Sequence, residues 1–113
     1  MPLPDLGFSR RRINDVVSGA ILQTRRQRAG TTYRKSVHYD DTVLELTIRY
    51  PTGTGLLAGI GSWTLTYRQG RTEVWRLQRR HGAPGGPETS GTLPRTLGPS
   101  LWADLQALLP KTK

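Results

Sequence analysis

The segment SWTLTYRQGRTEVWRLQRR, from Ser62 to Arg80, decides the fold. Apolar and polar residues alternate on both sides of a central Gln-Gly, a pattern that predicts two paired β-strands. The apolar members on one side of the strands are Trp63, Leu65, Tyr67, Trp75 and Leu77. We therefore expect both tryptophans to belong to the core of a sheet, which makes base stacking the less favoured use of these rings.

The length of the loop sets which residues share a face of this hairpin. A two-residue loop at Gln69-Gly70 would turn Trp75 away from Trp63. We therefore predict a three-residue loop, 68–70, with Gly70 in the left-handed conformation that such a loop requires. This register pairs Trp63 with Trp75 and Leu65 with Glu73, and leaves Thr64, Thr66, Thr72, Val74, Arg76 and Gln78 on the outer face.

A second hairpin precedes this one, in TYRKSVHYDDTVLELTIRY. With Asp40-Asp41 as a two-residue turn, Tyr39 faces Thr42, and the alternation on both sides becomes consistent. One face then carries Tyr33, Lys35, Val37, Leu44, Leu46 and Ile48, and the other carries Arg34, Ser36, His38, Glu45, Thr47 and Arg49.

Helices are predicted at both ends of this core. Residues 9–29 follow an i, i+3, i+4, i+7 apolar pattern, with Ser9 as N-cap and Gly30 after the last turn. Ser100 caps a short helix that Pro110 ends. The fold class is α+β: an N-terminal helix, a four-stranded antiparallel sheet of two hairpins and a short C-terminal helix. Around the 9–80 core we expect an extended arm (1–8), a Gly/Pro-rich flexible loop (81–99) and a C-terminal helix with a basic tail (100–113).

Charge gives the main indication of function. Among 113 residues, 17 Lys and Arg oppose 8 Asp and Glu, for a net charge of +9 and a pI near 11.1. Such a field attracts polyanions, and arginine binds phosphate as a planar fork. We expect a non-enzymatic protein that binds DNA or RNA with weak sequence preference, because nothing resembles a base-reading helix. The expected binding residues are Arg10, Arg11, Arg12, Arg25, Arg26, Arg28, Arg34, Arg68, Arg76, Arg79 and Arg80.

Two alternatives remain open. The arm, the Gly-rich segment 51–61 and the long loop are extensions of the kind that a shell or ring subunit uses, as in a virus particle or phage neck. In that segment Leu56, Leu57 and Ile60 would contact a neighbouring subunit. The second alternative is a small metal-independent RNase, with His38, Arg34, Glu45 and Arg49 on one face as acid–base and phosphate-binding groups.

Several classes of site are disfavoured. The chain has no cysteine, which fits a reducing compartment, and no apolar run long enough to span a membrane. We expect a cytoplasmic protein, or a virion component if the protein is viral. GTGLLAG, 53–59, resembles a dinucleotide-binding loop but precedes a strand instead of a helix, and HYDD, 38–41, is typical of a turn. We therefore expect neither a cofactor nor a metal.

Overall fold

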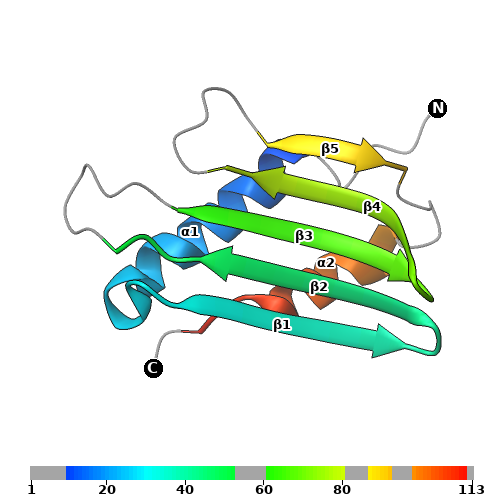
Figure 1. The fold of residues 1–113 in the computed structure, drawn as a ribbon, viewed down its shortest axis with the longest axis horizontal. Coiled ribbons are helices and arrows are strands. Elements are labelled where there is room, and N and C mark those ends of the chain that lie inside the picture. The colour runs from blue at the N-terminus through cyan, green and yellow to red at the C-terminus, as the bar shows by residue number, and fades with distance from the viewer. Residues whose placement is uncertain (1–9, 53–60, 81–86, 93–97, 112–113) are drawn as a thin grey trace.

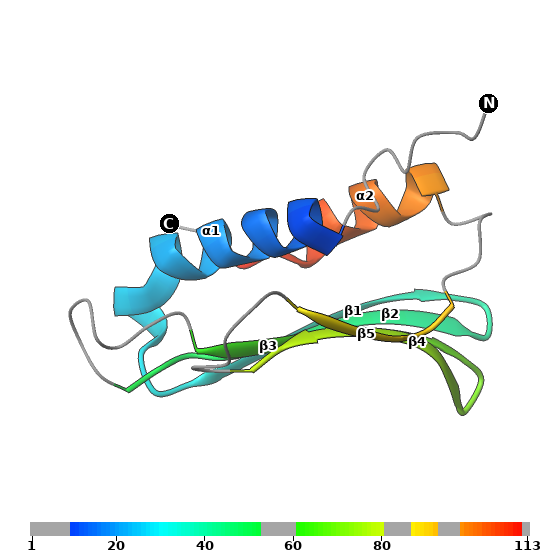
Figure 2. The ribbon, with the colours of Figure 1, turned by 90° about the horizontal axis from the view of Figure 1, so that it is seen from above.

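The computed structural model describes residues 10–52, 61–80, 87–92 and 98–111, which form two layers (Figure 1). One layer is a five-stranded antiparallel sheet in the order β1-β2-β3-β4-β5, so each strand pairs with the next along the chain. The other layer contains the two helices, which lie on the same face of the sheet and leave the opposite face uncovered (Figure 2). The elements are α1 (Arg10–Arg28), β1 (Thr32–Tyr39), β2 (Thr42–Arg49), β3 (Ser62–Gln69), β4 (Thr72–Arg79), β5 (Glu88–Gly91) and α2 (Gly98–Leu108). The predicted α+β class is confirmed.

A single hydrophobic core fills the space between the helices and the sheet. The sheet contributes alternate residues of its three inner strands, and each helix contributes one stripe. The buried apolar residues are Ile13, Val17, Ile21, Leu44, Leu46, Ile48, Tyr50, Trp63, Leu65, Tyr67, Trp75, Leu77, Leu101, Leu105 and Leu108. Both tryptophans of the second hairpin therefore lie in the core, as their alternation predicts.

Helix α1 agrees with the predicted bounds to within one residue. Its buried stripe repeats at helical spacing, and Gly30 follows its last turn with φ of +76°. Thr24 is the fully buried polar member of the stripe. Its hydroxyl donates to Ala20 O (2.9 Å) and lies 2.6 Å from the Tyr50 hydroxyl at the end of β2. This contact joins the helix layer to the sheet.

The first hairpin has the predicted register. Tyr39 pairs with Thr42 and Val37 with Leu44, across a turn in which Asp40 has a φ of +49°. Tyr33 and Tyr39 extend towards the helices, where their hydroxyls donate to Leu108 O and to Asp104 Oδ1, each at 2.6 Å. Because paired residues point the same way, Arg34, Ser36, His38, Glu45, Thr47 and Arg49 share the uncovered face.

The predicted loop and register of the second hairpin are wrong. Gln69 pairs with Thr72, so the turn is Gly70-Arg71, and Leu65 pairs with Leu77 instead of Glu73. The register shifts between Tyr67 and Arg68. A β-bulge with Val74 as the extra residue returns Trp75 to the inner face. The predicted three-residue loop would also have placed Trp75 on the inner face. Gly70 has the expected positive φ, +61°, whereas Val74 packs against the core and does not share the outer face.

The sheet also has a fifth strand that the sequence pattern did not predict. β5 lies within the segment expected to be a flexible loop, and Leu77 pairs with Thr89. Gly91 permits this pairing because its φ is +80° and because a Cβ there would overlap the Val74 carbonyl. The predicted four-stranded sheet is therefore corrected to five strands. The predicted arm lies outside the described residues.

The two edges of the sheet are poorly suited to pairing with another strand. β5 has only four residues. β1 carries Arg34 on one face and Lys35 on the other, and charges pointing both ways along an edge disfavour edge-to-edge association. Among the described helices, none combines the length and hydropathy needed to cross a membrane.

Candidate nucleic-acid interface

The uncovered side of the sheet, here called the open face, is built from rows of paired polar residues. Antiparallel pairing brings one residue of each strand into each row, so the register fixes the rows. One central row contains Arg34, Thr47, Thr64, Gln78 and Glu88, and the next contains Ser36, Glu45, Thr66, Arg76 and Ser90. Hydroxyl donors therefore lie between cationic and anionic groups across the whole width of the sheet.

Four arginines belong to the open face, and they differ in how they are held. Arg34 and Arg49 are exposed, on neighbouring strands. Arg76 is bound to Glu73, with its Nη2 and Nε at 2.7 and 3.0 Å from Oε1. Arg68 is half-buried, and its Nε is buried without a hydrogen-bond partner. Arg34 and Arg49 are thus the arginines of this face best placed to bind an external anion.

The four RNase candidates share the open face, because the first hairpin has its predicted register. His38 Nε2 lies 3.0 Å from Ser36 Oγ, and Ser36 is paired with Glu45. Arg34 and His38 are exposed, and both helices lie on the other side of the sheet. These groups occupy four successive rows of an exposed surface that neither helix shields from water, and His38 and Arg49, six positions apart along the hairpin, lie about 20 Å from each other.

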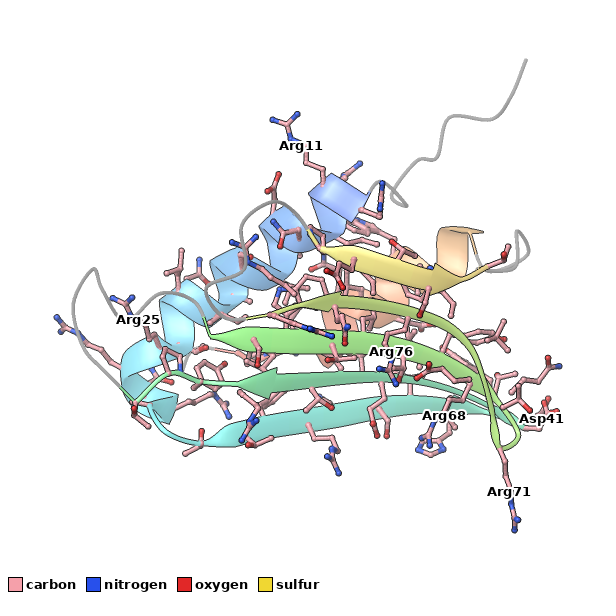
Figure 3. The ribbon with its side chains drawn as sticks, turned by 45° about the horizontal axis from the view of Figure 1, so that its top comes forward. Arg11, Arg25, Asp41, Arg68, Arg71 and Arg76 are labelled. Carbon is pink, nitrogen blue, oxygen red and sulfur yellow. The ribbon has the colours of Figure 1, made fainter. Side chains whose placement is uncertain are left out.

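A second basic surface lies on the helix layer, on the side of α1 that faces away from the sheet. We call it the α1 ridge and define it by Arg11, Asp15, Leu22 and Arg26, which are exposed and recur at helical spacing. Six arginines oppose one aspartate in this helix. Figure 3 shows Arg11 projecting from the helix layer, and Arg68 and Arg76 on the sheet. Fifteen residues separate Arg11 from Arg26, or about 22 Å along a helix.

Several of the predicted arginines also have structural contacts. The Arg12 guanidinium lies over the Trp102 ring at 4.7 Å, which links α1 to α2. The Arg28 guanidinium lies over Tyr33 at 5.0 Å, which links the end of α1 to β1. Arg10 donates to Thr89 Oγ1 (3.5 Å) and, with Arg11, Asn14 and Pro87, lines a shallow depression of about 380 Å³. These arginines therefore help to hold α1 in place, in addition to contributing positive charge.

The predicted arginine set is therefore divided between opposite faces. The open face has Arg34, Arg68 and Arg76, and α1 has Arg10, Arg11, Arg12, Arg25, Arg26 and Arg28. Arg79 pairs with Trp63 in a row that faces the helices, and Arg80 follows the end of β4. The predicted nucleic-acid set omits Arg49, although the alternation of its strand already places it with Arg34.

Three tyrosines near the helix–sheet junction have raised pKa values. Burial is the main cause of the raised pKa of Tyr33 and of Tyr50, and the hydrogen bond to Asp104 is the main cause of the raised pKa of Tyr39. These phenols therefore stay neutral around pH 7 and add no negative charge to the protein. Within the described ranges, no group of three or more His, Asp or Glu residues is arranged to hold a metal ion.

No protein-family model, curated protein or solved structure matches this chain. Leu56, Leu57 and Ile60, the residues of the predicted partner-binding loop, lie outside the described residues, as does the glycine motif at 53–59. The open face and the α1 ridge are therefore the features of the described residues that bear on function.

Proposed function

We propose that this protein binds nucleic acid through phosphate contacts, without catalysis and with weak sequence preference. The observation that carries the proposal is the position of exposed arginines on both sides that the fold leaves uncovered. Arg34 and Arg49 lie on the open face, and Arg11 and Arg26 lie on the α1 ridge. The net charge of +9 supplies the long-range attraction that brings a polyanion to either surface.

The chemistry of the open face supports contact with a phosphate backbone. Arg34 is paired with Thr47, and Arg49 lies two residues further along the same strand. Such diagonal neighbours are about 7–8 Å apart, so one segment of backbone can reach both. Hydroxyls of Thr47 and Thr64 lie beside them as neutral donors. Both tryptophans of the second hairpin are buried, which leaves arginine forks and hydroxyls to make the contacts and favours backbone over base recognition.

Fluorescence anisotropy with a labelled 12-base-pair duplex, titrated over a range of salt concentrations, tests this proposal. We expect log K to fall linearly with log salt concentration, since each phosphate contact releases counterions. The Arg11→Gln/Arg26→Gln/Arg34→Gln/Arg49→Gln variant removes two contacts from each surface. A duplex that lies on one surface then loses two contacts, so at about 0.9 ions per contact its affinity at 0.1 M salt should fall by roughly 60-fold.

Arg71→Gln is the matched control, because Arg71 is an exposed arginine in the β3–β4 turn and belongs to neither surface (Figure 3). We expect it to change the affinity by less than about twofold, as for a single charge away from the contact. An affinity insensitive to salt, or equal losses in the control and the quadruple variant, would contradict phosphate binding by these surfaces.

The RNase is a second candidate, favoured by the register that places Arg34, His38, Glu45 and Arg49 on one face of the sheet, with Glu45 in the row between those of His38 and Arg34. Incubation with a labelled RNA in EDTA, followed by electrophoresis, measures its activity. Cleavage by the wild type that His38→Ala abolishes would support this candidate. Intact RNA at protein concentrations that saturate binding would leave the non-catalytic proposal in place.

The assembly-subunit alternative predicts instead that light scattering finds a closed oligomer and that this oligomer does not bind nucleic acid at low salt.

A further inference from the structure

We infer that one molecule binds two nucleic-acid duplexes at once, one on the α1 ridge and one on the open face, and so bridges them. This inference rests on the proposed function. It goes further because binding needs only one basic surface, whereas bridging needs two that work independently. The structural basis is that the helix layer separates the α1 ridge from the sheet and that both surfaces face outwards (Figures 2 and 3).

The distance between the surfaces makes them electrostatically independent. The shortest dimension of the molecule is 25 Å, and it runs across the two layers (Figure 1). The Debye length at physiological ionic strength is about 8 Å. Charges on opposite sides of the two packed layers lie more than one Debye length apart and are screened from each other, so a phosphate bound on one side neither strengthens nor blocks binding on the other.

The geometry also prevents one short duplex from using both surfaces. A 12-base-pair duplex is rigid, because the persistence length of DNA is about 150 base pairs. The core between α1 and the sheet is solid, with Val17, Ile21 and Leu65 at 0% exposure. A rigid duplex that lies on the open face therefore cannot bend around the edge of the sheet to reach Arg11 and Arg26.

Independence gives a distinctive pattern of binding losses. The helix variant, Arg11→Gln/Arg26→Gln, leaves the open face intact, and the sheet variant, Arg34→Gln/Arg49→Gln, leaves the α1 ridge intact. If the two surfaces have similar affinity, each variant loses one of two equivalent sites, and its affinity for a single duplex falls by about twofold. The quadruple variant weakens both sites and falls by roughly 60-fold. A single composite surface would give large losses in each variant that multiply in the combination.

Bridging is measured directly with two duplexes. A biotinylated 12-base-pair duplex on beads is saturated with protein, excess protein is washed away, and a fluorescent duplex of the same sequence is added. We expect wild-type protein to retain the fluorescent duplex. We expect the helix variant and the sheet variant to retain roughly 60-fold less, although both still bind one duplex in anisotropy. Far-UV circular dichroism checks that the exposed substitutions leave the fold unchanged.

A mixture of the two variants separates bridging by one molecule from bridging by an oligomer. Because each molecule of the mixture has only one intact surface, we expect the mixture to retain no more than either variant alone. Restored retention would overturn the inference, since it would show that separate chains share the two contacts. Wild-type protein that binds the first duplex but retains no second one would also overturn it. Wild-type protein that binds no duplex at low salt would refute the proposed function itself.

Discussion

The contact between Thr24 and Tyr50 allows a quantitative test of how α1 is held on the sheet. Thr24 is 0% exposed and Tyr50 is 4% exposed, and their hydroxyls are 2.6 Å apart. The Thr24 hydroxyl also donates to Ala20 O, so the Tyr50 hydroxyl is the donor between the two side chains. Thr24→Val keeps the branched shape but leaves a buried phenol without its acceptor, which costs about 1–3 kcal/mol.

Removing the hydroxyl of the other partner, Tyr50, should lower the free energy of unfolding by less. Tyr50→Phe leaves the Thr24 hydroxyl bonded to Ala20 O, so only the net value of one hydrogen bond is lost, about 0.5–1.5 kcal/mol. The double variant removes both partners, and its loss should be smaller than the sum of the single losses. Urea denaturation followed by tryptophan fluorescence gives all three free energies of unfolding. Additive losses, or a smaller loss for Thr24→Val than for Tyr50→Phe, would refute this account of the helix–sheet contact.

Four further predictions concern two backbone positions, pH and the open face. Gly19→Ala should raise the free energy of unfolding by about 0.5–1 kcal/mol, since Gly19 is in mid-helix with nothing within 4 Å of a Cβ. Gly61→Ala should lower it by at least about 1–2 kcal/mol, since φ is +88° and the Cβ would overlap the Arg49 carbonyl; thermal unfolding measures both. The raised pKa values of Tyr33 and Tyr50 mean that the folded state holds these protons more tightly, so stability is complete below about pH 10 and falls as the pH rises through the raised values. Alkaline denaturation should show this fall, and Tyr50→Phe should make it less steep. Glu45→Gln, in the helix variant where the open face alone binds, should tighten duplex binding by roughly threefold, the effect of removing a like charge about 7 Å from a phosphate in water; unchanged or weaker binding in anisotropy would argue against contact at the open face.

The positions of the arginines on the open face and on the α1 ridge follow in large part from local sequence patterns. The alternation of the first hairpin is sufficient to place Arg34, Glu45 and Arg49 on one face, since a two-residue turn at Asp40-Asp41 permits one consistent register. The helical period likewise puts Arg11 and Arg26 opposite the buried stripe of α1. α1 packs on the side of the sheet opposite to those strand arginines. That choice follows from burying the apolar faces together, and it separates the arginines into two surfaces.

The amino-acid sequence by itself thus determined α1, the first hairpin with its register and the inward direction of Trp63, Leu65 and Trp75, because these depend on local periodicity. It did not determine the second turn. A three-residue loop and a two-residue turn with a bulge at Val74 both bring Trp75 inwards, and only pairing across the whole sheet selects between them. Nor did it predict β5, since Glu88–Gly91 has no apolar alternation and pairs with β4 through its backbone. Those features depend on contacts between distant segments, which only the tertiary structure specifies.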